Sequence, residues 1–102
     1  MMNRKMLKQA QELQKQMLQV QQEVESSSVE ATSGGRVVTV RVTGKMTLES
    51  LKISKDVVDP EDVEMLEDLV QAAINEGLSK AQQMASEKMN AVTGGMNIPG
   101  LS

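Results

Sequence analysis

The chain has 102 residues, enough for one domain with a modest core, and its formal net charge is −3. It contains no His or Cys, so it lacks the side chains of Ser-His and Cys-His nucleophile pairs and of zinc sites, and we expect neither an enzyme nor a metal, cofactor or small-molecule substrate. It also lacks Phe, Tyr and Trp, which excludes the stacking surfaces that bind single-stranded nucleic acids. No apolar run is long enough to cross a membrane, and the absence of Cys fits the cytoplasm.

The first predicted element is an amphipathic helix over about residues 3–25. Its apolar residues alternate at four- and three-residue spacing, as in a heptad repeat, and the residues between them are mostly Gln, Lys and Glu. Such a helix is roughly 33 Å long, about the width of a compact chain of this size, so it spans the molecule or projects from it. A projecting seam needs a partner, which we expect to be a second copy of this chain. The seam residues assigned to dimer or arm packing are Leu13, Met17, Val20 and Val24.

Three antiparallel strands are predicted over about residues 28–54. Gly34-Gly35 suits the positive φ angles of a tight hairpin turn. Strict alternation of apolar and polar residues predicts a strand over 38–43 whose core side carries Val38, Val40 and Val42. After a turn at Gly44-Lys45, the strand over 46–54 changes its apolar phase, which predicts a β-bulge.

A second, longer helix is predicted over about residues 60–91. Asp59 can cap its start, and Pro60 suits the first helical position. The residues from 94 to 102 are expected to form a flexible tail. Residues 1–93 are therefore predicted to form a single α+β domain in the order helix, three-stranded antiparallel sheet, long helix.

This order, with particular residues at these positions, resembles the YbaB/EbfC family of bacterial nucleoid-associated proteins over nearly the whole chain. The most specific segment is the acidic helix start Glu64-Met65-Leu66-Glu67-Asp68-Leu69-Val70-Gln71-Ala72-Ala73-Ile74-Asn75 after Asp59-Pro60. Supporting segments are Met6-Leu7-Lys8-Gln9-Ala10-Gln11 with Met17, and Gly94-Gly95-Met96-Asn97-Ile98-Pro99-Gly100. The resemblance implies a tweezer-like homodimer that binds double-stranded DNA with low sequence preference. It also implies a place in the nucleoid and a role in nucleoid organisation and gene regulation.

The residues that contact DNA are predicted from charge. Two cations lie in the first turn of the first helix, where the helix dipole disfavours them by about 0.3–1 kcal/mol each. An unfavourable placement is more easily tolerated if the charges have another role, so we assign phosphate contact to this basic end. A solvated helix end is the alternative explanation. Two further cations lie on the sheet, where protection of an exposed strand from edge pairing is the alternative. The DNA-binding residues assigned in this way are Arg4, Lys5, Lys8 and Lys15 in the helix and Arg41 and Lys45 in the sheet.

The acidic run from Asp56 to Asp68 contains no Lys or Arg and would repel phosphate. It does not match an EF-hand, because Val58 and Pro60 occupy ligand positions, and helix capping accounts for most of its carboxylates. The main alternative function is a protein–protein adaptor or a prefoldin-like chaperone that uses the helical arms or the sheet face. Suppression of client aggregation without retardation of DNA would favour that alternative.

Overall fold

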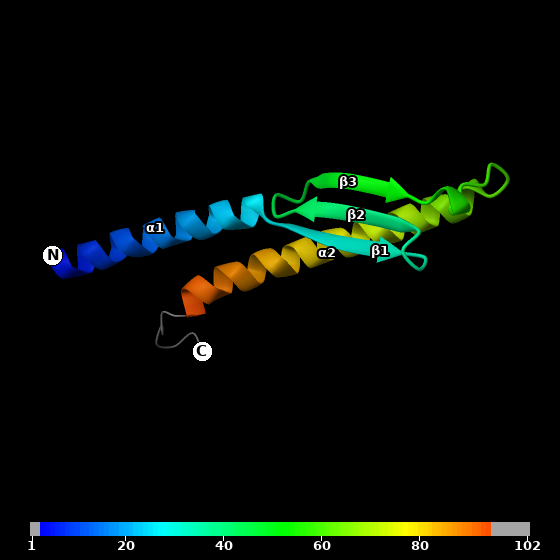
Figure 1. Ribbon diagram of the computed structural model, residues 1–102. Coiled ribbons are helices and arrows are strands. Elements are labelled where there is room, and N and C mark those ends of the chain that lie inside the picture. The colour runs from blue at the N-terminus through cyan, green and yellow to red at the C-terminus, as the bar shows by residue number, and fades with distance from the viewer. Residues whose placement is uncertain (1–2, 95–102) are drawn as a thin grey trace.

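The molecule is elongated: one helix projects from a three-stranded sheet, and a longer helix runs along the sheet and past it (Figure 1). The structure is a computed structural model that describes residues 3–94. Its elements are α1 (Arg4–Ser26), β1 (Ser28–Ser33), β2 (Val38–Thr43), β3 (Leu48–Ile53), the 3₁₀ turn η1 (Lys55–Val57) and α2 (Val63–Gly94). The predicted α+β class and order of elements are confirmed. The radius of gyration is 20.0 Å, whereas a compact chain of this length has about 13 Å.

Short polar side chains define both ends of α1. The side-chain oxygen of Asn3 accepts a hydrogen bond of 2.8 Å from the backbone N–H of Met6 and so caps the first turn. At the other end, the hydroxyls of Ser26 and Ser27 donate to the carbonyl of Glu23 at 3.2 and 2.6 Å. These serines satisfy a carbonyl that a continuing helix would otherwise use, and the chain enters β1 directly after them.

The strands form an antiparallel sheet in the order β1-β2-β3. The first turn has positive φ at Gly34 (61°) and Gly35 (71°), as predicted, and also at Arg36 (74°), which residue type alone does not indicate. The predicted bulge in β3 is confirmed: Arg41 pairs with Ser50, but the next residue of β2 pairs with Leu48. The extra residue accounts for the change of apolar phase along β3.

The start of α2 differs from the prediction. The helix begins at Val63 rather than at residue 60, because Asp59 closes a turn instead of capping the helix: its carboxylate accepts from the N–H of Glu61 at 2.9 Å. Asp62 is the actual cap, since its carboxylate accepts from the N–H of Met65 at 3.2 Å. At the other end α2 continues to Gly94. The tail predicted for 94–102 therefore lies, apart from Gly94, outside the described residues.

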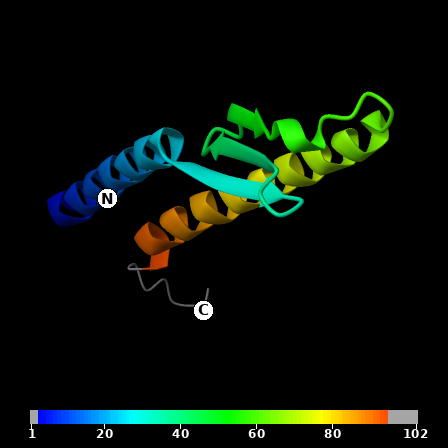
Figure 2. The same cartoon turned by 45° about the vertical axis from the view of Figure 1, so that its right-hand side comes forward.

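The core is small and lies between α2 and the first two strands. Figure 2 shows β1 beside α2 and β3 farthest from it. The predicted core side of β2 is confirmed, because its three valines are fully buried. No described residue larger than valine is fully buried, and the buried apolar residues are Val24, Ala31, Val38, Val40, Val42, Ala73 and Ala81.

Gly44 provides a test of the junction between α1 and the sheet. Its N–H donates to the carbonyl of Ser27 at 3.0 Å, and a Cβ at this position would collide with the backbone carbonyl of Val24. We expect Gly44→Ala to lower the free energy of unfolding by about 3 kcal/mol or more, because the backbone cannot move aside as a flexible side chain can. Urea unfolding at a fixed protein concentration measures this change.

Gly35→Ala is the matched control. A Cβ at Gly35 meets open space, so the substitution carries only the cost of a positive φ, about 1–2 kcal/mol. Equal losses of stability in the two variants would contradict the predicted close contact at Gly44.

Candidate nucleic-acid interface

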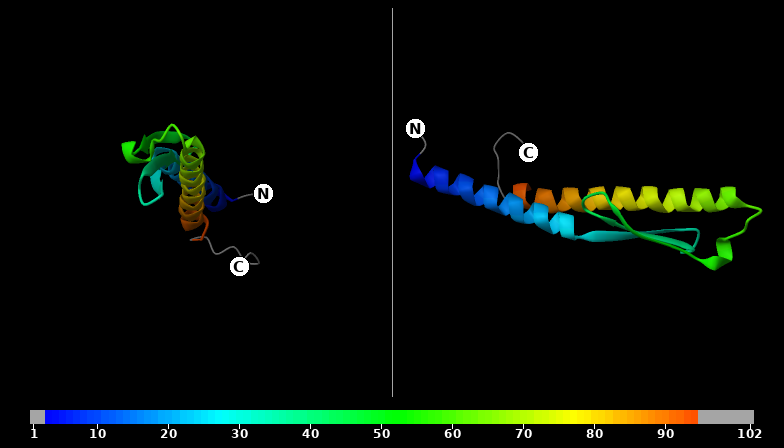
Figure 3. Two further views of the ribbon diagram at one scale, coloured as in Figure 1. Left: turned by 90° about the vertical axis from the view of Figure 1, so that its right-hand side faces the viewer. Right: turned by 90° about the horizontal axis from the view of Figure 1, so that it is seen from above.

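α1 packs along the C-terminal half of α2 and extends beyond the last described turn of that helix (Figure 3). Within the predicted seam, the residue nearest the sheet is the most buried: Val24 is buried, Val20 and Leu13 are half-buried, and Met17 is 38% exposed. Met6, at the far end, is 55% exposed. The base of the seam is therefore covered within one chain, while the tip of α1 stands free of the rest of the described molecule.

Three of the four cations of α1 lie on the side of the helix away from this seam. At 100° per residue, Arg4, Lys8 and Lys15 fall within about 40° of one another and roughly 180° from the seam. All three are exposed, and so is Lys5, which lies about 100° round the helix from Arg4. We call Arg4, Lys8 and Lys15, with Lys5 beside them, the basic stripe. It extends about 17 Å along the helix axis.

No cation of the basic stripe forms an ion pair within the described residues. Within residues 3–94 one ion pair is formed, between Arg41 and Glu30 at 3.2 Å, and it involves no residue of α1. Glu12 is the only acidic residue between positions 4 and 22. The charges of the stripe are therefore available to an external anion, and the positive end of the α1 dipole adds to them.

The two DNA-binding residues predicted on the sheet, Arg41 and Lys45, differ in whether their charge is already paired. Arg41 is already engaged on the outer side of the sheet, because its guanidinium donates to the hydroxyl of Ser28 at 3.1 Å and to the carboxylate of Glu30. Lys45 is exposed in the turn between β2 and β3, beside the last residues of α1. Lys15, the nearest residue of the basic stripe, is about 16 Å along the helix from Ser26, where α1 ends beside the sheet. Arg41 and Lys45 are therefore separated from the basic stripe.

The acidic run occupies the other end of the molecule. Asp56, Asp59, Glu61, Asp62, Glu64, Glu67 and Asp68 are all exposed, and Figure 1 shows the segment before α2 at the end opposite the start of α1. Among the described residues no group of carboxylates is arranged to hold a metal ion. No helix in the described part is long and apolar enough to cross a membrane.

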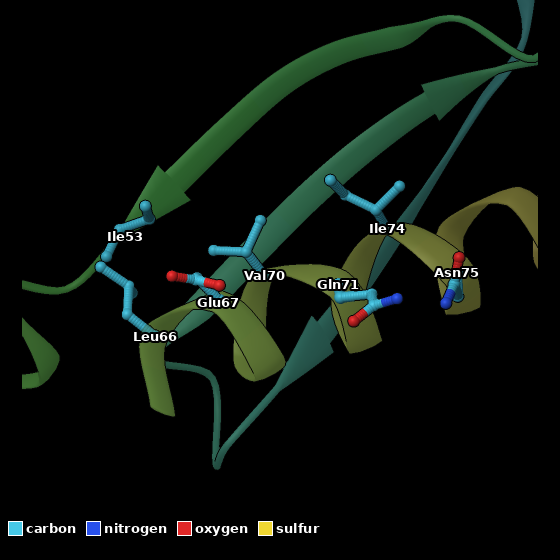
Figure 4. Close-up of a pocket in the computed structure, with 7 residues that line it drawn as sticks. All are labelled: Ile53, Leu66, Glu67, Val70, Gln71, Ile74 and Asn75. Atoms are coloured by element: carbon cyan, nitrogen blue, oxygen red, sulfur yellow. The ribbon is translucent and has the colours of Figure 1, made fainter. Parts of the chain in front are cut away.

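Reasoning from the sequence missed a groove between β3 and α2. The groove has a volume of about 470 Å³ and is lined by Ile53, Leu66, Glu67, Val70, Gln71, Ile74 and Asn75 (Figure 4). The number of predicted strands was the signal in the sequence that could have indicated this groove. All three carry apolar residues on one side, and a single helix cannot cover three strands that lie about 4.8 Å apart.

Residues 1–96 match the model of the YbaB/EbfC DNA-binding family. The chain belongs to this family. It is 53% identical over 96 residues to a nucleoid-associated protein of Alkaliphilus metalliredigens, covering 94% of this chain and 84% of that protein. A nucleoid-associated protein of Chloroflexus aurantiacus is 47% identical over 96 residues, covering 94% and 96% of the two chains. The resemblance seen in the sequence is confirmed: the YbaB/EbfC family is a family of nucleoid-associated DNA-binding proteins, not of enzymes.

The fold also has a counterpart among solved structures. A crystal structure of an uncharacterised protein from Helicobacter pylori superposes with a TM-score of 0.68 at 22% sequence identity. The match covers 85% of this chain and 92% of that chain. At this identity the similarity concerns the fold alone.

Introducing a charge at a buried position tests whether the C-terminal end of α1 is anchored through its seam. Val24→Asp places a carboxylate where the side chain is 8% exposed, so we expect a loss of about 2–4 kcal/mol in the free energy of unfolding. Gln22→Asp is the matched control, because Gln22 is exposed on the opposite side of the same helix and should change stability by less than about 0.5 kcal/mol. Urea unfolding measures both. An unaffected Val24→Asp variant would show that α1 is not anchored through its seam.

Proposed function

We propose that the chain binds double-stranded DNA as a homodimer, with low sequence specificity and mainly through phosphate contacts from the basic stripe of α1. The observation that supports this most directly is a set of exposed, unpaired cations on the free side of a projecting helix, in a member of a DNA-binding family. The protein would act in the nucleoid, as the names of its nucleoid-associated relatives suggest, and its role there would be in nucleoid organisation and gene regulation.

The chemistry of the stripe favours contact with phosphates over recognition of bases. Lys and Arg attract the DNA backbone by neutralising phosphates and releasing counterions, and these contacts carry no sequence information. The exposed amides of Gln11, Gln19 and Gln22 lie on the same side of α1 and can add hydrogen bonds to sugar or phosphate oxygens. A narrow helical face of this kind predicts low sequence specificity.

Two arms bind better than one in an acidic protein. Each chain has a net charge of −3, and the acidic run is repelled by DNA, so one stripe alone should bind weakly. A homodimer presents two stripes on one body, and the second then binds at a high effective concentration. Arg41 and Lys45 stay secondary candidates, with Arg41 weakened by its pairing to Glu30.

The salt dependence of binding tests the phosphate mechanism. If each protomer makes about three phosphate contacts, the logarithm of the binding constant should fall with log[salt] at a slope of roughly −5. Retardation of an unrelated duplex in a gel across a salt series gives this slope. An affinity that does not change with salt would contradict the mechanism.

Neutralisation of the stripe tests which cations act. Replacing Arg4, Lys5 and Lys8 by Gln removes up to six contacts from a dimer, so retardation at moderate salt should be lost. Replacing Arg36, Lys55 and Lys80 by Gln is the matched control, since it changes the net charge equally and leaves α1 intact; we expect less than about a threefold change in affinity. Comparable loss in both variants would mean that overall charge, rather than the stripe, determines binding.

A further inference from the structure

A line of hydrogen-bond donors extends the basic stripe to the end of α1. In steps of three or four residues from Arg4, every side chain opposite the seam is a cation, an amide or a hydroxyl, and none is acidic. All of them are exposed and lie within about 40° of the direction opposite the seam. We call this line the donor track. Beyond the three cations on that side, it contains Gln11, Gln19, Gln22 and Ser26.

The outer side of the sheet carries the same kinds of side chain. Because the valines of β2 point inward, Thr39 and Arg41 point outward, and so do the residues that face them across the ladder. These partners are Thr32 and Glu30 on β1 and Lys52 and Ser50 on β3. The one acidic residue that the register places on this side, Glu30, is neutralised by Arg41.

Two lysines of the sheet region keep their charge free. Within residues 3–94 the ion pair of Arg41 takes up neither Lys45 nor Lys52, and both lysines are exposed. Lys45 lies in the turn beside the end of α1, where the N–H of Gly44 donates to the carbonyl of Ser27. Between positions 28 and 55 the chain has five Lys and Arg against two Glu, although its total charge is −3. The sheet region is therefore as positive as the α1 segment from 4 to 22, which has four cations and one acid.

The donor track and the outer side of the sheet both face away from α2. α1 packs on α2 through its seam, and the sheet packs on α2 through its inner side. Both lie on the same side of α2 in Figures 1 and 2. Together their outward surfaces form one polar strip along the long dimension of the molecule, which is 71 Å.

The spacing of cations along this strip is close to one turn of a DNA duplex. The middle of the basic stripe lies about 25 Å along the helix from Ser26. Lys52 faces Thr39, which lies four residues, about 13 Å, along β2 from its end beside α1. With α1 and the strands in line, the two distances amount to roughly 38 Å, and one helical turn of B-DNA is about 34–36 Å. A duplex along the strip therefore presents the same side of its backbone to the stripe and to Lys52.

We propose that the outer side of the sheet is a second contact zone for the duplex that the basic stripe binds. Lys45 and Lys52 contact phosphates there, and the outward hydroxyls donate to sugar or phosphate oxygens. Arg41 keeps Glu30 from repelling the backbone. The duplex lies on the side of the molecule away from α2, in which five acidic residues outnumber two lysines. This zone rests on the DNA binding in the proposed function and adds to it the direction in which the duplex runs.

Photo-cross-linking from single cysteines tests where the duplex lies. The chain has no cysteine, so an azidophenacyl group attaches only at an introduced one. Ser50→Cys places this group on the outer side of the sheet, and the matched control Ser79→Cys places it on the side of α2 away from the sheet. Gln11→Cys, in the donor track, reports contact with the stripe. With a duplex of about 30 base pairs, we expect Gln11→Cys and Ser50→Cys to cross-link and Ser79→Cys to give about a tenth of their product or less.

The three variants separate this zone from the proposed function. Cross-linking from Gln11→Cys without cross-linking from Ser50→Cys would overturn the second zone and leave the stripe in place. Equal product from Ser50→Cys and Ser79→Cys would also overturn it, because the duplex would then lie on no particular side. A wild-type chain that does not retard the duplex would overturn both the zone and the proposed function.

The salt dependence of binding provides the second test. Replacing Lys45 and Lys52 by Gln leaves the stripe intact, and we expect the slope of log K against log[salt] to become shallower by about 0.9 for each lysine lost. Replacing Arg36 and Lys55 by Gln is the matched control: the change in charge is the same, but both residues lie at the end of the sheet where the acidic run begins. This control should keep the wild-type slope. The same change of slope in both variants would overturn the zone, because net charge alone would then account for it.

Discussion

The close approach of α2 to the sheet determines the rest of the structure. Small residues recur every four positions along the inner side of the helix, at Ala73, Gly77 and Ala81, so the helix axis lies close to the strands. A Cβ at Gly77 would come within 2.8 Å of a methyl group of Val42. A helix seated this closely covers a narrow strip. The larger apolar residues of α2 are left on its flank, where Leu66, Val70 and Ile74 line the groove beside β3.

The fold could be predicted from local patterns because most of its elements are defined locally. Alternation identified β2 and its buried side, and Gly34-Gly35 identified the hairpin turn. The start of α2 was wrong because Asp59 and Asp62 are both suitable caps, and only the turn between them shows which one acts. The coverage of the sheet could not be predicted, because it depends on how closely the helix approaches, which is a property of the packed structure.

The candidate site shows the same division between local and non-local information. Helical periodicity alone places Arg4, Lys8 and Lys15 on one side of α1, opposite the seam, since the spacing of residues on a helix is fixed. The situation of Arg41 could not be predicted in this way. Its pairing with Glu30 depends on the register between β1 and β2, and a shift of one residue would turn either side chain to the other side of the sheet.

Because α2 is long, a small rotation at one of its ends produces a large displacement at the other. One uninterrupted helix of 32 residues carries the groove in its first half and the packing surface for α1 in its second. Val70 and Gly94 are about 36 Å apart along its axis, so a rotation of one degree at the groove moves the far end by roughly 0.6 Å. Five degrees displace it by about 3 Å, the length of a hydrogen bond. A small change in the angle between α2 and the sheet is therefore enlarged at the far half of the helix, where α1 packs.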